Sequence, residues 1–377
     1  VKGATKGLLV GKKIVLKDNI CLAGVPMMNG NSYLEGYIPE IDATIVTRIL
    51  DQGGTIVGKA HSENLCMSGG SFSNAKGAIH NPHKYGYIAG GSSSGVAALV
   101  GSKEVEIGIG GDQGGSIRIP ASFCGVVGMK PTFGLVPYTG IMPIETSVDH
   151  PGPITSNVLD NALVLEVIAG PDGIDPRQKL PENSYGGYLS KIKDGVKGMR
   201  IGILKEGFGT PKSEKVVDEL VLKAAYEFKD LGASVDEVSI PQHVYGYLVC
   251  RIIISEGSFQ TMMNGNGFGF GQLGLYLPSL MKAQAKWKTH PNQLSKSSRL
   301  LTILSDHMWT EYNGTFYAKA QNIARKFKKI YDEKFKEYDI IVMPTLPHRA
   351  KEIPSEDCDM DEYMDKVGSM VFNTRIF

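Results

Sequence analysis

Short apolar runs typical of β-strands alternate with amphipathic helical patterns along most of this 377-residue chain. This alternation is the pattern of an α/β protein, in which helices cover the faces of a sheet. Strands are expected at 12–18, 55–59, 105–108, 199–204, 233–240 and 339–345. Helices are expected at 42–52 with Asp42 as N-cap, 92–100, 159–168, 213–231, and 296–338 with an interruption near Gly314. We therefore predict an α/β fold with a mixed, largely parallel central sheet and helices on both faces.

Charge and cysteine usage limit the classes of function. Forty Lys and Arg residues balance thirty-nine Asp and Glu residues, and no long basic run is present. This balance argues against electrostatic capture of nucleic acid or of an anionic membrane, and favours a small-molecule substrate. The five cysteines are scattered without a C-x-x-C pair, which argues against a disulfide framework or a zinc site. We expect reduced thiols in a cytoplasmic protein without a membrane span.

The 46 glycines concentrate between positions 53 and 152, where a strand pattern runs into Gly110–Arg118 (GGDQGGSIR). Glycines before a serine allow consecutive backbone N–H groups to point into one concavity, which suits a developing oxyanion. The candidate donors are the N–H groups of Gln113, Gly114, Gly115 and Ser116. Asp112 and Arg118 bracket these glycines, and an ion pair between them would hold the loop in one shape.

Two further segments carry polar groups that could meet this loop. In Ala89–Gly95 (AGGSSSG), Ser92 lies 24 residues before Ser116, close enough for a strand and a turn to bring the two hydroxyls together. In Ile14–Asn19 (IVLKDN), strand alternation turns Lys17 to the same face as Val15. A serine at a helix start is usually a cap and a lysine in a strand is usually solvated, so each signal alone is weak.

Together the three segments resemble the amidase signature family, whose Lys–cis-Ser–Ser triad lies in a strand lysine and two glycine-rich loops. The matching positions are Lys17, Ser92 and Ser116, and the resemblance continues through 123–143 and 149–155 before thinning to 342–345. The motifs are most similar to those of bacterial acylamide amidases associated with nitrile hydratases. The resemblance implies an amidase that converts carboxamides to a carboxylic acid and ammonia, without a cofactor or metal.

The resemblance also implies a role for each group. Ser116 attacks the amide carbonyl, and its proton passes through Ser92 to an uncharged Lys17, while Ser93 supports the loop and the Gly91–Ser92 peptide bond is cis.

Tyr138 and Met142 are candidate substrate-binding residues. We expect one amidase domain over 1–377, truncated at both ends relative to the family, in which about 241–312 forms a variable helical segment covering the substrate. The sequence leaves the oligomeric state open, a homodimer included.

Three alternatives compete with this interpretation. The first keeps the family but makes the chain a glutaminase-type subunit of a tRNA-dependent amidotransferase. The second takes G-x-S-x-G at positions 91–95 as a nucleophile elbow, with Ser93 as the nucleophile and His150 or His243 as the base. The third is a nucleotide-binding module, which lacks its phosphate-loop motif here. His80 and His83 could suggest a metal site, but a surface turn is the better interpretation because no further ligands lie near them in the sequence.

Overall fold

The computed structural model describes residues 1–376 and has ten strands among them. A five-stranded sheet has the order β2-β1-β5-β7-β6, and a three-stranded parallel sheet has the order β10-β8-β9. In the larger sheet β2, β1 and β5 are parallel, whereas β7 is antiparallel to β5 and β6. The strands are β1 (Lys13–Lys17), β2 (Thr55–Ala60), β5 (Ile107–Asp112), β6 (Val127–Gly128), β7 (His150–Thr155), β8 (Arg200–Leu204), β9 (Ser234–Val238), β10 (Ile340–Val342) and the small hairpin β3 (His80–Asn81) with β4 (Lys84–Ile88).

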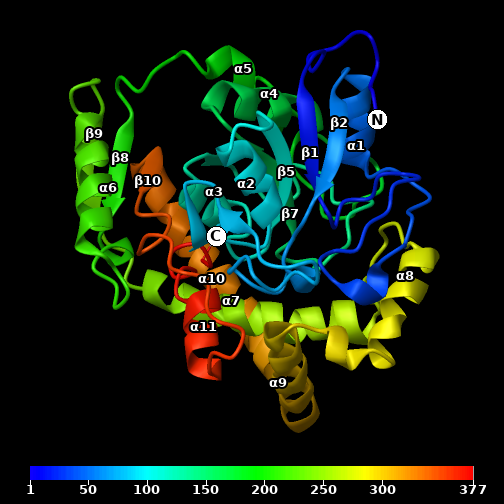
Figure 1. The fold of residues 1–377 in the computed structure, drawn as a ribbon. Coiled ribbons are helices and arrows are strands. Elements are labelled where there is room, and N and C mark those ends of the chain that lie inside the picture. Colours follow the sequence, from blue (N-terminus) through cyan, green and yellow to red (C-terminus); the bar gives the residue numbers. More distant parts are fainter. Residues whose placement is uncertain (377) are drawn as a thin grey trace.

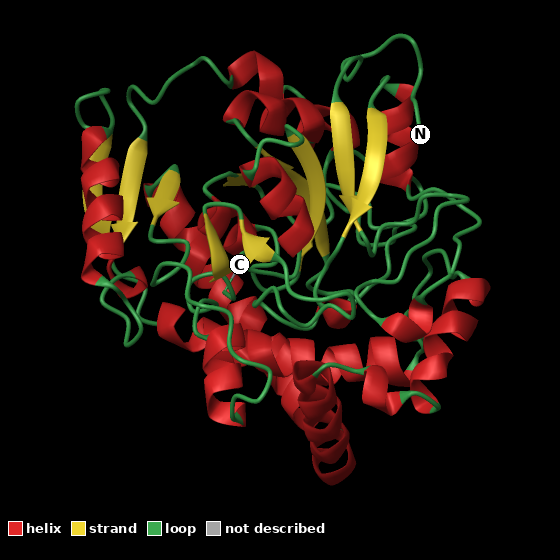
Figure 2. Ribbon diagram, in the orientation of Figure 1, coloured by secondary structure: helices red, strands yellow, loops and turns green. Residues whose placement is uncertain are grey.

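Helices pack on both sides of these sheets, as the two ribbon views show (Figures 1 and 2). The helices are α1 (Thr44–Asp51), α2 (Ser94–Gly101), α3 (Arg118–Cys124), α4 (Val158–Ile168), α5 (Tyr188–Lys191), α6 (Lys215–Glu227), α7 (His243–Ser258), α8 (Pro278–Gln284), α9 (Lys296–Tyr312), α10 (Thr315–Glu337) and α11 (Met360–Gly368). Helices α7, α9 and α11 lie along the lower edge of the molecule in Figure 1. The α/β class and the mixed sheet with helices on both faces are therefore confirmed.

The alternation of β1 decides which side of the sheet receives the lysine. Ile14 and Leu16 are fully buried in the cluster that includes apolar residues of α1 and α4. Val15 instead belongs to the cluster on the opposite face, together with apolar residues of α2. Because side chains alternate along a strand, Lys17 points to the α2 face, where the serine-rich loop ends.

Most of the expected elements are present, but several boundaries differ. Helix α1 begins after Ala43, because the carboxylate of Asp42 accepts the N–H of Ala23 at 2.7 Å instead of capping the helix. The long helical pattern breaks into α9 and α10 at Asn313 and Gly314, both of which adopt left-handed backbone conformations. Helices α3 and α7 were not expected from the sequence. Within residues 1–376, no helix is long and apolar enough to cross a membrane.

Candidate active site

A buried lysine and a buried serine lie in direct contact at the end of β1. The Lys17 Nζ donates to the Ser92 Oγ at 2.7 Å and to the carbonyl of Gly111 at 3.2 Å. Both side chains are completely shielded from solvent. The structure therefore brings together two of the three residues that the sequence singled out.

The loop that carries Ser92 leads directly into α2. The Gly91–Ser92 peptide bond is cis, as expected. Ser93 is the N-cap position of α2, and its hydroxyl donates to the Gly111 carbonyl and accepts the Gly111 N–H, both at 3.2 Å. The backbone N–H of Ser93 donates to the carbonyl of Ser116 at 3.2 Å. These bonds tie the two serine-bearing loops to each other.

The loop from Asp112 to Arg118 is organised around one carboxylate. Asp112 accepts the backbone N–H groups of Gly115 at 2.7 Å and of Ile117 at 3.1 Å. It also accepts two bonds from the Arg118 guanidinium, each of 2.9 Å. Burial alone would raise the pKa of the Asp112 carboxyl, but Arg118 outweighs this effect and holds that pKa well below its ordinary value. The expected Asp112–Arg118 pair is thus present.

Glycine is required at position 115 of this loop. Its φ is +130°, and a Cβ there would lie 2.6 Å from both Ile119 Cδ1 and Thr374 Oγ1. Of the four N–H groups expected to bind an oxyanion, that of Gly115 already donates to Asp112. The N–H groups of Gln113, Gly114 and Ser116 make no hydrogen bond within residues 1–376, so these three donors are free to bind a ligand.

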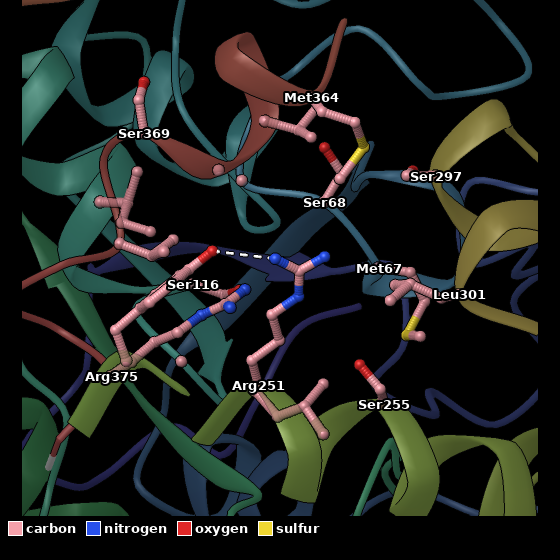
Figure 3. A pocket seen from close by; sticks show the side chains of 18 of the residues that line it. Met67, Ser68, Ser116, Arg251, Ser255, Ser297, Leu301, Met364, Ser369 and Arg375 are labelled. Carbon is pink, nitrogen blue, oxygen red and sulfur yellow. Dashed lines mark hydrogen bonds between the residues drawn. The ribbon is translucent and has the colours of Figure 1, made fainter. Parts of the chain in front are cut away.

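Ser116 opens onto a cavity of about 770 Å³ (Figure 3). Its side of the cavity is formed by the glycine loop and by Cys66 to Gly69, and the opposite sides by residues of α7, α9 and α11. Much of the lining is apolar, including Ile119, Ile144, Ile254, Leu300 and Leu301. An apolar cavity with a few convergent polar groups is typical of a small-molecule site.

Tyr138 and Met142 do not line this cavity. The Tyr138 hydroxyl accepts a bond from the Gln113 side-chain amide at 3.2 Å, and Met142 is fully buried in a neighbouring core cluster. The two residues lie behind the glycine loop, where they support Gln113.

Three residues that border the cavity were missed at the level of sequence. The Thr374 hydroxyl donates to the Gly114 carbonyl at 2.8 Å and so fixes the glycine loop from the end of the chain. Arg251 on α7 and Arg375 both line the cavity. No local pattern could have identified them, because they are more than 130 residues from the loop that they approach.

The histidines make contacts that do not involve Ser93. His150 bonds to the Val148 carbonyl at 2.7 Å and lies 3.3 Å from Lys130 Nζ. His243 is bonded to Tyr331 and Asn373. The Ser93 hydroxyl has only backbone partners in the described chain, so the geometry does not support a Ser–His pair built on Ser93.

The two turn histidines likewise have ordinary partners. His80 stacks on Tyr85 with ring centroids 3.9 Å apart, and the His83 Nε2 lies 2.8 Å from the Cys124 carbonyl. Over residues 1–376, no group of three or more His, Cys, Asp or Glu side chains is arranged to hold a metal ion.

Comparison with known proteins places this geometry in context. The Amidase family model matches residues 1–375. The enantioselective amidase of Rhodococcus rhodochrous is 41% identical over 374 residues, which cover 98% of this chain and 72% of that protein. One subunit of the glutamyl-tRNA(Gln) amidotransferase of Gloeobacter violaceus is 34% identical over 352 residues, which cover 93% of this chain and 71% of that protein.

Solved structures agree with this result. The crystal structure of the corresponding glutamyl-tRNA(Gln) amidotransferase subunit from Thermotoga maritima superposes with a TM-score of 0.81 at 30% sequence identity, covering 100% of this chain and 76% of that one. The similarity therefore extends over both sheets and the helices that pack on them.

Proposed function

Since this chain belongs to the amidase family and is a hydrolase of amide C–N bonds, we propose that Ser116 is its nucleophile and that Ser92 and Lys17 form its proton relay. The observation that carries this proposal is the 2.7 Å contact between Lys17 Nζ and Ser92 Oγ at full burial. Ser116 supplies the third group, because its loop is bonded to the Ser92 loop and it opens onto the cavity.

In the proposed reaction, Ser116 Oγ attacks the amide carbonyl while its proton passes through Ser92 Oγ to the uncharged amine of Lys17. The oxyanion accepts N–H bonds from the glycine loop, with Gln113, Gly114 and Ser116 as donors. The protonated Lys17 returns the proton through Ser92 to the leaving nitrogen, and ammonia departs. Water then attacks the acyl-enzyme, with the same relay taking its proton, and releases the carboxylic acid.

Asp112, Arg118 and Ser93 act as positioning residues in this proposal. Asp112 and Arg118 fix the glycine loop, and Ser93 fixes the position of Gly111 relative to Lys17. Tyr138 acts through the side chain of Gln113, and Met142 packs behind it. We propose no direct contact of Tyr138 or Met142 with substrate.

We further propose that residues 1–377 work as a single amidase domain and that 241–312 form its substrate-covering segment. This assignment is supported by α7 and α9, because both helices contribute side chains to the wall of the cavity that faces Ser116. Exchanging 241–312 with the same segment of a relative should transfer amide preference without moving the labelled serine.

We propose a small amide as the substrate and hydrolysis without a partner enzyme. The identity to the Rhodococcus amidase, 41%, exceeds the 34% to the Gloeobacter amidotransferase protein, which favours the stand-alone activity over the glutaminase role. Release of ammonia from simple aliphatic and aromatic amides, without ATP or added protein, would separate the two roles.

The cellular setting is also part of the proposal. A cytoplasmic location is supported by five free thiols, and a near-neutral net charge of +1 gives no reason to expect nucleic acid as a partner. Whether the enzyme is a homodimer is tested by sedimentation of the purified protein, and the location by fractionation of cells.

A fluorophosphonate probe tests the nucleophile directly. We expect one adduct on the peptide that contains Ser116, mapped by mass spectrometry, and loss of this adduct in Lys17→Ala. An adduct on Ser93, or activity that survives Ser116→Ala, would contradict the assignment.

A further inference from the structure

Two arginines face the catalytic cavity without an acidic partner. Arg251 extends from α7 into the cavity, and Arg375 approaches the same space from the end of the chain (Figure 3). Neither guanidinium forms an ion pair within residues 1–376, although Arg118 and Arg177, which are also largely buried, each have an aspartate. The pair therefore differs from the arginines that hold the fold together.

The contacts that these arginines do make are with neutral groups. Arg251 Nη1 donates to the hydroxyl of Tyr247 at 3.1 Å, and the Arg375 guanidinium lies 5.5 Å from the centre of the same ring. The Nε of Arg375 is buried and has no hydrogen-bond partner. A buried cationic donor without a partner is costly, and an anion supplied by a ligand would relieve that cost.

The other charged groups around the cavity do not neutralise the arginines. Asp365 on α11 is bonded to Lys212 at 2.9 Å and to Lys351 at 2.7 Å, so two lysines already compensate it. Asp361, at the start of α11, is exposed. The side of the cavity next to the glycine loop thus keeps a net positive charge from Arg251 and Arg375.

The arginines lie close to the reacting groups. A Cβ added to Gly114 would lie 3.3 Å from Arg375 Nε, so the Arg375 side chain packs directly on the proposed oxyanion loop. Apolar side chains, among them Ile119 and Ile254, line the same cavity. A ligand that suits this lining has an apolar spacer between its amide and an anionic group.

We infer that Arg251, with Arg375 beside it, forms an anion-binding subsite that selects amides carrying a free carboxylate, such as the monoamides of aliphatic dicarboxylic acids. This inference rests on the proposed role of Ser116 in amide hydrolysis. Guanidinium groups bind carboxylates through paired N–H bonds, which neutral amides of the same length cannot make. Hydrolysis of such a monoamide consumes one water and gives the dicarboxylate and ammonia.

The test compares each monoamide in a series of increasing chain length with the straight-chain alkyl amide of equal length. For wild type we expect kcat/KM to be at least about tenfold higher for the best monoamide than for its neutral match. Arg251→Met should lower kcat/KM for the monoamide about tenfold to hundredfold, mainly through KM, and leave the neutral amide within roughly twofold. Arg375→Met should act in the same direction.

Lys212→Met is the matched control, because it removes a cation from the same cavity that is already paired with Asp365. It should leave the ratio between the two substrates nearly unchanged. If Arg251→Met lowers both substrates equally, or if wild type shows no preference for the monoamide, the anion subsite is wrong while amide hydrolysis stands. If wild type hydrolyses neither substrate, the proposed function fails, and this inference fails with it.

Discussion

The Nζ of Lys17 lies 2.7 Å from the Oγ of Ser92 where neither side chain reaches solvent. Lys59, on the neighbouring strand, is also largely buried, but its ammonium lies 3.3 Å from Asp18. Within residues 1–376, Lys17 forms no such ion pair, and its partners are a hydroxyl and a carbonyl. A lysine in this setting is suited to exchange a proton with Ser92, whereas Lys59 holds two segments together.

Lys17→Met should abolish most of the activity while keeping the fold. Methionine has a similar length and tolerates the buried site, but it cannot accept the proton, so we expect kcat to fall by about 10²- to 10⁴-fold. Lys13→Met, at the exposed end of the same strand, is the matched control and should retain activity. The measurements are steady-state kinetics and thermal melting; a Lys17→Met enzyme that is folded and fully active would contradict the relay.

The wild-type rate should also depend on pH. Protonation of the Lys17 amine removes the proton acceptor, so kcat/KM should fall as the pH is lowered from about 8 to about 5. A rate that stays constant over this range, in protein shown by circular dichroism to remain folded, would count against a lysine base.

Asp112→Asn should destabilise the protein much more than an equivalent change at the surface. The substitution leaves the Arg118 guanidinium without its buried partner and weakens the bonds to the Gly115 and Ile117 N–H groups, so we expect a loss of about 3–5 kcal/mol in the free energy of unfolding. Asp339→Asn, which breaks the exposed pair with Arg200, should cost no more than about 1 kcal/mol. Urea unfolding of both variants checks the comparison, and equal losses would contradict it.

Local patterns predicted the parts of the site whose residues are close together in the chain. The alternation of Val15 and Lys17 correctly placed the lysine on the α2 face, because strand geometry fixes it. The pairing of Asp112 with Arg118 was also accessible, because six residues of a tight loop separate them. In both cases the determining interactions lie within a single segment.

The parts that could not be predicted depend on contacts between distant segments. Asp42 has the right side chain for an N-cap, yet it bonds to Ala23 in a neighbouring loop, so α1 starts without it. Arg251 lies on a helix whose apolar residues, such as Val249 and Ile253, do not form a simple stripe that would mark it in the sequence. Thr374 reaches Gly114 across 260 positions of the chain. Tertiary structure alone brings these residues to the site.

Thr374→Val should lower activity more than Thr374→Ser. Valine keeps the shape of threonine but removes the hydroxyl that donates to the Gly114 carbonyl at 2.8 Å, whereas serine keeps that hydroxyl. Because this bond positions the N–H groups of the glycine loop, we expect kcat to fall about tenfold or more in the valine variant and to recover largely in the serine variant. If the two variants lose activity equally, the methyl group and not the hydrogen bond is what matters.

Asp149 makes stability depend on pH in a direction opposite to that of most carboxylates. Burial raises the pKa of its carboxyl to about 7, although the nearby Arg177 acts in the opposite direction. In the unfolded chain this pKa is about 3.9. Between these two values the folded protein holds a proton that the unfolded chain releases, so the stabilisation is complete at low pH and is lost as the pH rises through about 7.

Asp149→Asn should remove this dependence, because the amide is neutral at every pH and its oxygen can still accept the Ile144 N–H. The difference in unfolding free energy between the variant and wild type should therefore shift in favour of the variant by up to about 4 kcal/mol between about pH 4 and about pH 7. The control is Asp175→Asn. Burial alone would raise the pKa of the Asp175 carboxyl, but hydrogen bonds and charge from Arg177 outweigh burial and lower that pKa. Its effect should therefore change only below about pH 4. Urea titrations at each pH measure both differences, and a flat difference for Asp149→Asn across this range would show that the Asp149 carboxyl is ionised in the folded protein.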